Sequence, residues 1–360
     1  MLTRLYIDNF RCFEKFEWRP GRKQLILGRN GTGKTSLMAA LHYIVQVAAR
    51  GDRVDQWFKL NQRTSWLHQP EQVFEMEVQL NGRNYWYRLV VEFWGEPLLP
   101  RVKSEAVRLD GEPILVSKGG EVIFGSQRLA SDQSRSALAI GSSFGTSELQ
   151  QLRKWMGGVR CSHINPFLMG SRVRGSAVDP RLDLIDMAGW YRHLVQAYPK
   201  ENAAFLEDLY ASLDGLNRLW LEYDDENNAT LYAEFSRKGR ATRIPFGELS
   251  DGQRCIVCLY AIGHFVAARG GTVIIDEPDN FISLREIQPW LMRIEEIADD
   301  NDGQVILISH HPEILNQWAG PYGVQFIRDG AGPVRVEKFK GDPGSALTVA
   351  ELVARGWDLG

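Results

Sequence analysis

Residues 28–35 of this 360-residue chain read GRNGTGKT, which places three glycines ahead of a lysine and a threonine. Glycines allow backbone N–H groups to close around phosphate oxygens, and a lysine at this spacing reaches the β- and γ-phosphates of a nucleotide. The threonine hydroxyl is a ligand for Mg²⁺. The segment satisfies the P-loop pattern and predicts binding of ATP and Mg²⁺. The residues expected to contact this cofactor are Asn30, Gly31, Gly33, Lys34, Thr35 and Ser36.

The elements on either side of the loop favour this interpretation over that of an ordinary glycine-rich turn. Residues 24–27 are a short β-prone run that ends at Gly28, and residues 35–47 place leucine, isoleucine and valine at helical spacing. A strand, a tight loop and a helix in that order are what the phosphate-binding mechanism requires.

Residues 272–278 (TVIIDEP) are an apolar run that ends in two carboxylates, the form of a Walker B element. Asp276 is predicted to hold the Mg²⁺ shell. Glu277 is predicted to orient and deprotonate the attacking water. A solvated strand end would fit the same pair taken alone, so its weight depends on the motifs around it.

Residues 249–253 (LSDGQ) precede a predicted helix. A serine hydroxyl, a glycine backbone and a helix N-terminus together can bind phosphate. The simpler alternative is an ordinary N-cap, in which Ser250 or Asp251 satisfies the first N–H groups of the helix. The two interpretations are compatible.

Residues 305–310 form a predicted strand that ends in a histidine. The position of His310 at the end of the segment 305–310 favours it as a site residue over the adjacent His311. A lone histidine is more often structural, so this assignment also depends on the accompanying motifs.

In this order the four motifs resemble those of the ABC-type ATPases. Residues 7–11 (IDNFR) and 276–280 (DEPDN) are similar to the RecF-like and OLD-like branch of that family, which is related to SMC proteins. The resemblance covers about residues 1–50 and 245–318. It implies an ATPase that converts ATP and water to ADP and phosphate.

The resemblance also implies roles for individual residues. The catalytic residues would be Glu277, Lys34 and His310, and Mg²⁺ would be held by Thr35 and Asp276. The family forms head-to-tail homodimers around ATP, so the trans contacts to the γ-phosphate would come from Ser250, Gly252 and Gln253. Arg11, in the opening Asn-Phe-Arg stretch, becomes a candidate phosphate contact.

The chain departs from the family in several places. After Asn280 it has Ile282-Ser283 instead of a leucine followed by aspartate or histidine, which leaves coupling between the two sites open. The Q-loop glutamine is not identified, and Gln133 is a weak candidate. About forty residues follow Leu315, too few for the TOPRIM nuclease domain of OLD proteins. The CxxC pair Cys255 and Cys258 lies in an apolar helix and is predicted to be core packing.

The expected fold class is α/β: an ABC-ATPase P-loop core of a mixed sheet with flanking helices, an antiparallel β section, an inserted helical lobe and no long coiled coil. The expected parts are a discontinuous core at 1–60 and 245–345, a β section at 61–145, a helical/signature lobe at 146–244, and a tail at 346–360.

Composition is ordinary for a globular protein, and the formal charge of −3 gives no whole-protein cationic field. Four scattered cysteines fit a reducing compartment. With neither an export signal nor a membrane-spanning run in the sequence, the expected location is the cytoplasm and no membrane partner is expected. Local basic residues could still meet nucleic acid, although a solvated face is the simpler account; they are Arg160, Arg172, Arg174, Arg181, Arg237, Lys238, Arg240 and Arg243.

The leading hypothesis is an ATP-dependent homodimer that senses or controls a separately encoded effector, such as a nuclease or toxin, in anti-phage defence. The alternative is a RecF-like repair or recombination clamp that binds duplex DNA. A third reading, the ATPase subunit of a membrane transporter, is disfavoured by the residues that resemble the SMC-related branch.

Overall fold

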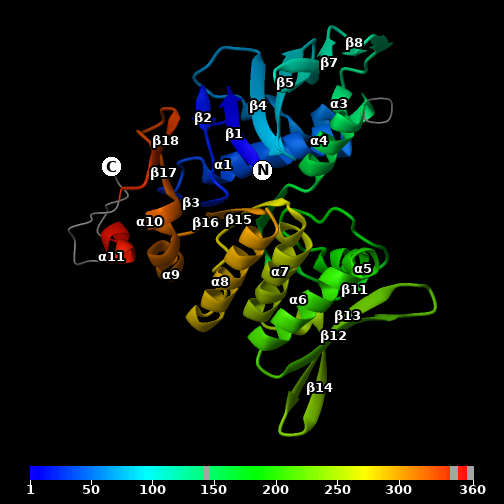
Figure 1. Cartoon of the computed structure of the whole chain (residues 1–360), viewed down its shortest axis with the longest axis vertical. Coiled ribbons are helices and arrows are strands. Elements are labelled where there is room, and N and C mark those ends of the chain that lie inside the picture. Colours follow the sequence, from blue (N-terminus) through cyan, green and yellow to red (C-terminus); the bar gives the residue numbers. More distant parts are fainter. Residues whose placement is uncertain (142–145, 341–347, 355–360) are drawn as a thin grey trace. The chain divides into compact units, whose positions relative to one another are not determined.

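A computed structural model describes residues 1–141, 146–340 and 348–354 of the chain. It divides into two compact units (Figure 1). Unit 1 combines Met1–Val159 with Ala319–Gly360, and unit 2 is the continuous segment Arg160–Trp318. Of the tail expected at 346–360, residues 346–347 and 355–360 lie outside the described part, and helix α11 (Val349–Ala354) lies within it.

The larger sheet of unit 1 is antiparallel throughout. Its strands, in spatial order, are β2 (Phe16–Trp18), β1 (Leu2–Asp8), β4 (Glu71–Leu80), β5 (Arg83–Trp94), β6 (Leu99–Leu109), β7 (Glu112–Lys118), β8 (Glu121–Phe124) and β9 (Gln127–Ala130). Along β4 buried and half-buried residues alternate, as expected when one face of a sheet packs on a core. The alternation of residues 73–116, broken at Asn81-Gly82, Gly95 and Asp110-Gly111, predicts antiparallel hairpins, and the structure has them.

Two of these hairpins turn at sequences that favour a tight turn. Asn81 and Gly82 join β4 to β5, and both have positive φ, as a two-residue hairpin turn requires. Asp110 and Gly111 repeat this arrangement between β6 and β7. Short-range turn chemistry therefore fixes the register of both pairs.

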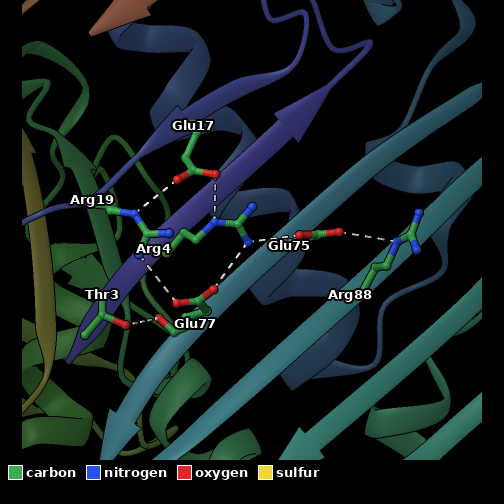
Figure 2. Close-up of polar contacts among 7 residues, drawn as sticks. All are labelled: Thr3, Arg4, Glu17, Arg19, Glu75, Glu77 and Arg88. Atoms are coloured by element: carbon green, nitrogen blue, oxygen red, sulfur yellow. Dashed lines mark hydrogen bonds and ion pairs between the residues drawn. The ribbon is translucent and has the colours of Figure 1, made fainter. Parts of the chain in front are cut away.

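The exposed face of this sheet carries a chain of ion pairs, shown in Figure 2. Arg4 on β1 donates to Glu17 on β2 and to Glu75 on β4, each at 2.9 Å. Arg19 continues the chain from Glu17 at 3.0 Å, and Arg88 on β5 continues it from Glu75 at 3.6 Å. Charges of opposite sign on neighbouring strands thus support the sheet on its solvent side.

A second group of strands in unit 1 supports the glycine-rich loop. β3 (Lys23–Leu27) pairs in parallel with β17 (Gly323–Arg328), which pairs antiparallel with β18 (Val334–Lys338). The predicted helix at 35–47 is found as α1 (Lys34–Val45), extended by a π-helical segment, Gln46–Arg50. The predicted order of strand, loop and helix is confirmed.

In unit 2 three parallel strands lie side by side: β10 (Arg160–His163), β15 (Thr272–Asp276) and β16 (Gln304–Ile308). Every residue of β15 and β16 is buried. Continuous apolar runs of this kind are typical of parallel strands covered on both faces. Both strands match the sequence prediction, whereas β10 was not predicted.

Helices form a packed layer in unit 2. α6 (Pro199–Ser212), α7 (Asp251–Phe265) and α8 (Leu284–Asp300) pack against one another, as Figure 1 shows. α5 (Met187–Ala197) packs on α6. The helical spacing of apolar residues in 183–196, 202–213, 285–298 and the segment from about Gln253 predicts these four helices.

A small antiparallel sheet completes unit 2. Its strands are β11 (Arg172–Val173), β13 (Ala229–Arg237), β12 (Leu216–Tyr223) and β14 (Arg240–Pro245), with β14 paired to β13. The sequence predicts the β13–β14 hairpin, because residues 231–235 and 242–244 are β-prone runs on either side of Lys238-Gly239. It does not predict β11 and β12, because they interrupt a segment dominated by helical periodicity.

The fold is therefore α/β, with mixed and antiparallel sheets, as predicted. In the described part of the chain the longest helix, α8, has 17 residues, so no long coiled coil is present there. None of the described helices combines the length and apolarity that crossing a bilayer requires.

Candidate active site

The glycine-rich loop of unit 1 joins β3 to α1 and needs glycine at specific points. Gly28 has φ +145°, and a Cβ there would lie 2.5 Å from the Phe326 carbonyl oxygen on β17. Gly33 has φ +97°, and its Cβ would lie 2.8 Å from Cys12 Sγ. Around Gly31, by contrast, no heavy atom lies within 4 Å of the Cβ position. The loop is therefore tightly supported at both ends and open at its crest.

Lys34, the first residue of α1, folds back over this loop. Its ammonium donates to the carbonyl oxygen of Gly28 and, at 3.1 Å, to that of Arg29. Thr32 closes the same turn, because its hydroxyl donates to the Arg29 carbonyl at 2.8 Å. The lysine charge is thus concentrated at the loop and the helix N-terminus, where phosphate oxygens would be bound.

A residue that sequence reasoning missed braces the loop from β17. Arg328 donates to the Gly31 carbonyl at 3.1 Å and to the Gly332 carbonyl at 2.8 Å. It lies almost the whole chain away from the loop in sequence, so no local pattern indicated the contact.

The other site residues predicted in unit 1 differ in their exposure and contacts. Asn30 and Thr35 are exposed, and Ser36 is half-buried. Arg11 donates to the Tyr43 hydroxyl at 3.4 Å and lies 5.3 Å from the centre of the Phe10 ring. Tyr43 is two and a half turns beyond Lys34, about 13 Å along α1. The structure therefore places the Arg11 side chain near the C-terminal end of α1.

In unit 2, the signature segment forms the start of α7. Ser250 is the N-cap: its hydroxyl accepts from the Gln253 N–H at 3.3 Å, and the Gln253 side chain accepts from the Ser250 N–H at 3.1 Å. This reciprocal capping box satisfies two helix N–H groups. The N-cap interpretation is confirmed, and Ser250 remains exposed.

The two carboxylates after β15 occupy different environments. Asp276 is 8% exposed at the end of the buried strand. Glu277 has φ +50°, a left-handed conformation that is unfavourable for a residue with a side chain. Its N–H donates to the Ile308 carbonyl at 2.7 Å, and Asn280 donates to its carboxylate at 2.7 Å. The backbone strain is therefore held in place by specific contacts, as is typical of functional positions.

A histidine that sequence reasoning missed lies beside Asp276. His163, at the end of β10, has Nδ1 3.4 Å from Asp276 Oδ2. The Asp276 carboxylate raises the pKa of His163 by hydrogen bonding, and the charges of Glu277 and Asp183 act in the same direction. This strand end is thus strongly electronegative.

The two histidines after β16 lie in different environments. His311 caps α9 (Pro312–Ile314): its Nδ1 accepts from the Glu313 N–H at 3.3 Å, and its own N–H donates to Ser309 Oγ at 2.9 Å. His310 is exposed at the strand end. The structural role of His311 favours His310 as the functional member of the pair.

The candidate metal ligands, one hydroxyl and one carboxylate, suit Mg²⁺ better than a metal that is coordinated by protein side chains alone. Among described residues, no group of three or more histidine, cysteine, aspartate or glutamate side chains could hold a metal ion. Mg²⁺ usually takes one or two protein oxygens together with substrate phosphates and water. A hydroxyl such as that of Thr35 and the carboxylate of Asp276 fit this requirement.

Two family profiles match separate parts of the chain. Residues 4–152 match a family profile described as an AAA domain, and residues 174–316 match one described as "AAA domain, putative AbiEii toxin, Type IV TA system". Among curated proteins, no sequence matched this chain.

Solved structures give the fold. The chain is similar to an Smc head bound to the C-winged helix domain of ScpA, with TM-score 0.57 and 13% identity over 94% of this chain and 98% of that one. It is also similar to the Smc head domain with an extended coiled coil bound to the C-terminal domain of ScpA derived from Pyrococcus furiosus, with TM-score 0.51 and 10% identity over 99% of both chains.

The two AAA-domain profiles and the SMC-head fold support the predicted resemblance to ABC-type ATPases of the SMC and RecF branch.

The position of Gln133 does not suit a Q-loop glutamine, which would lie near the bound nucleotide. Its carbonyl accepts from the Val102 N–H at 2.7 Å, and its side chain accepts from Arg101 at 3.3 Å. The next residue, Ser134, accepts from the N–H of Val54, which follows the π-helical end of α1. Gln133 is therefore at the opposite end of α1 from Lys34, and the proposal that it serves as the Q-loop glutamine is withdrawn.

The cysteine pair has a structural role. Cys255 and Cys258 are buried in α7, where burial raises the pKa of Cys255 to about 12, so the predicted core packing is confirmed.

Several of the basic residues considered as nucleic-acid contacts are ion-paired to carboxylates, which makes them weaker candidates for binding phosphate. The pairs are Arg160 with Asp179, Arg172 with Asp224, Arg181 with Asp183, and Arg243 with Glu222. The Arg237 side chain lies outside the described part.

Proposed function

We propose that this chain hydrolyses ATP with Mg²⁺, and that ATP closes two copies head to tail in a cycle that senses or controls a separately encoded effector protein. Anti-phage defence, with a nuclease or toxin as effector, is the proposed setting. The observation that carries the ATPase proposal is the strained Glu277, held by Asn280 directly after the buried Asp276. An enzyme retains such strain where a carboxylate must be pre-positioned.

Each residue has a proposed task in hydrolysis. Lys34 and the N–H groups of the loop bind the phosphates, and Glu277 orients the attacking water and accepts its proton. Mg²⁺, when bound by Thr35 and Asp276, neutralises charge on the phosphates. His310, exposed at the end of β16, contacts the γ-phosphate in this proposal.

The capped start of α7 supports the dimer. Ser250 is exposed and Gly252 lies in the first turn, so the positive end of a 15-residue helix is presented at the surface. A second copy supplies the phosphate that this helix end binds. The likeness of residues 174–316 to a domain described as a putative AbiEii toxin supports the effector setting.

Mass measurement by light scattering tests the ATP-dependent dimer. The Glu277→Gln variant should bind ATP without hydrolysing it and should double its mass when ATP and Mg²⁺ are added. Lys34→Ala is the control and should remain a monomer without bound nucleotide. Unchanged ATP binding and hydrolysis in Lys34→Ala would refute the ATPase proposal.

A mixing experiment tests whether the site is shared between copies. Ser250→Asp retains a capping acceptor but places a negative charge against the γ-phosphate. Ser250→Asp and Lys34→Ala should each be inactive, whereas an equal mixture should regain activity, because a mixed dimer contains one intact shared site with Lys34 from one copy and Ser250 from the other. An inactive mixture would show that hydrolysis does not use a partner's signature segment.

Partner capture distinguishes the biological settings. Glu277→Gln should be purified with ATP from cells that carry its native neighbouring genes, and the co-eluting species identified by mass spectrometry. A co-eluting protein supports effector control. Co-eluting nucleic acid, with salt-dependent binding that needs ATP, would favour a DNA clamp instead.

A further inference from the structure

Three parallel strands of unit 2 end at one level. His163 on β10 is paired in register with Asp276 on β15, which is paired with Ile308 on β16. In open α/β sheets, ligands bind beyond the carboxyl ends of parallel strands. His163 therefore belongs to the same edge as Asp276, Glu277 and the residues that follow Ile308.

The support beneath His163 is rigid. Its N–H donates to the Leu182 carbonyl at 2.9 Å, and the Asn165 N–H donates to the Asp183 carbonyl at 3.0 Å. Ser162, the preceding residue, is 2% exposed. The strand end is thus fixed on both sides of the histidine, and the ring is presented in a defined place.

The contact with Asp276 is selective. Nδ1 of His163 lies 3.4 Å from Oδ2, and among the described residues no other side chain is paired with this carboxylate. The Asp276 side chain is 10% exposed and that of His163 is 49% exposed. Contact of one carboxylate oxygen with an imidazole nitrogen restricts the direction in which the second oxygen faces.

We propose that His163 is a positioning residue of the metal site: it holds Oδ2 of Asp276 so that Oδ1 faces the Mg²⁺ that accompanies ATP. This inference rests on the proposed ATPase function, and it assigns a role to a residue outside all four sequence motifs. Outer-shell partners of this kind commonly change metal affinity by about 10–100-fold when they are removed.

Two variants of the full-length chain separate this role from general support of the fold. His163→Leu fills the space without a donor. His163→Asn keeps an N–H donor near the position of Nδ1. Thermal unfolding of each variant establishes that both are folded before binding is compared.

The probe is Mn²⁺, which replaces Mg²⁺ and is detected by electron paramagnetic resonance in the presence of a non-hydrolysable ATP analogue. Binding of a fluorescent ATP analogue in EDTA is measured in parallel. His163→Leu should weaken Mn²⁺ binding about 10–100-fold, His163→Asn should stay within about threefold of wild type, and metal-free nucleotide binding should be equal in all three.

Two results would overturn the inference while leaving the proposed function intact: wild-type Mn²⁺ affinity in His163→Leu, or equal losses in the Leu and Asn variants. A wild-type chain that binds no nucleotide in EDTA and no Mn²⁺ with the analogue would instead refute the proposed function, and with it the metal site.

Discussion

A Cβ added to Gly252 would lie 2.7 Å from the backbone oxygen of Phe281. The first turn of α7 therefore touches the loop that follows Glu277. This contact joins the signature segment to the carboxylate segment within unit 2, although the two are separated in sequence by the whole of α7 and β15.

Gly252→Ala should therefore disturb both segments together. Because the clash is with backbone, the loop must shift, and we expect a loss of about 1–3 kcal/mol in the free energy of unfolding together with loss of ATPase activity. Gly239→Ala is unsuitable as a control because its φ is positive, whereas Gly320→Ala meets no atom within 4 Å and should leave activity unchanged. Denaturant unfolding and phosphate release measure the two effects. An active, fully stable Gly252→Ala would contradict the tight contact.

The strained backbone at Glu277 should lower the stability of the chain, while its carboxylate is needed for hydrolysis. Glycine tolerates positive φ, whereas alanine retains the strain, so Glu277→Gly should be about 1 kcal/mol more stable than Glu277→Ala. Both variants should lose hydrolysis while retaining nucleotide binding. Equal stabilities in urea unfolding would argue against strain at this position.

Arg328 should influence nucleotide affinity from outside the loop. Arg328→Met removes the donor to the Gly31 carbonyl, and we expect ATP binding to weaken roughly 5- to 10-fold through a looser loop. Arg335→Met is a matched control on β18, since Arg335 pairs with Asp329 and Glu337. Fluorescent-nucleotide titration compares the two, and similar affinities in both variants would contradict the bracing role.

The Arg4 ion pair in Figure 2 can be compared with the more exposed pair of Arg83 with Asp110. Arg4 and Arg83 each have a carboxylate partner at 2.9 Å, but the Arg4 side chain is 13% exposed and that of Arg83 is 48% exposed. Arg4→Met should cost about 1–2 kcal/mol because its carboxylate partners lose a charge-assisted bond in a partly buried site. Arg83→Met should cost less than about 0.5 kcal/mol. Equal costs in denaturant unfolding would refute the role of burial.

His264 predicts how stability depends on pH. It is 3% exposed, and burial lowers its pKa, although its contact with Asp208 opposes the shift. A lowered pKa means that the unfolded chain takes up a proton first, so this contribution is present above about pH 6.5 and is lost as the pH falls below it. Between pH 7 and 5 the wild type should lose more unfolding free energy than His264→Gln. Parallel pH profiles would contradict this.

The sequence predicted those parts of the fold that local patterns determine. The tight turn at Asn81-Gly82, the fully apolar β15 and β16, and the helix after the P-loop all follow from residue spacing, and the structure has each of them. The four motifs also predicted the resemblance that the two AAA-domain profiles support.

Elements stabilised by distant partners were missed. β10 is four residues long, and it is a strand because β15 lies beside it, so neither its existence nor the place of His163 could be read locally. The same holds for Arg328, whose contact with Gly31 depends on the pairing of β17 with β3. Sequence motifs identify residues that bind a common ligand, but not the neighbours that hold them in position.

The pairing of β3 with β17 has a consequence for synthesis of the protein. Ile26 and Val324 lie side by side, although they are 298 positions apart in sequence (324 minus 26). Residues 160–318 are complete before β17 exists, while the apolar strand β3 must wait without this neighbour. Long-range parallel pairing of this kind forms slowly and exposes an aggregation-prone edge meanwhile. The glycine-rich loop thus gains the Phe326 and Arg328 contacts only after β17 has been translated, so nucleotide binding that depends on these contacts follows synthesis of unit 2.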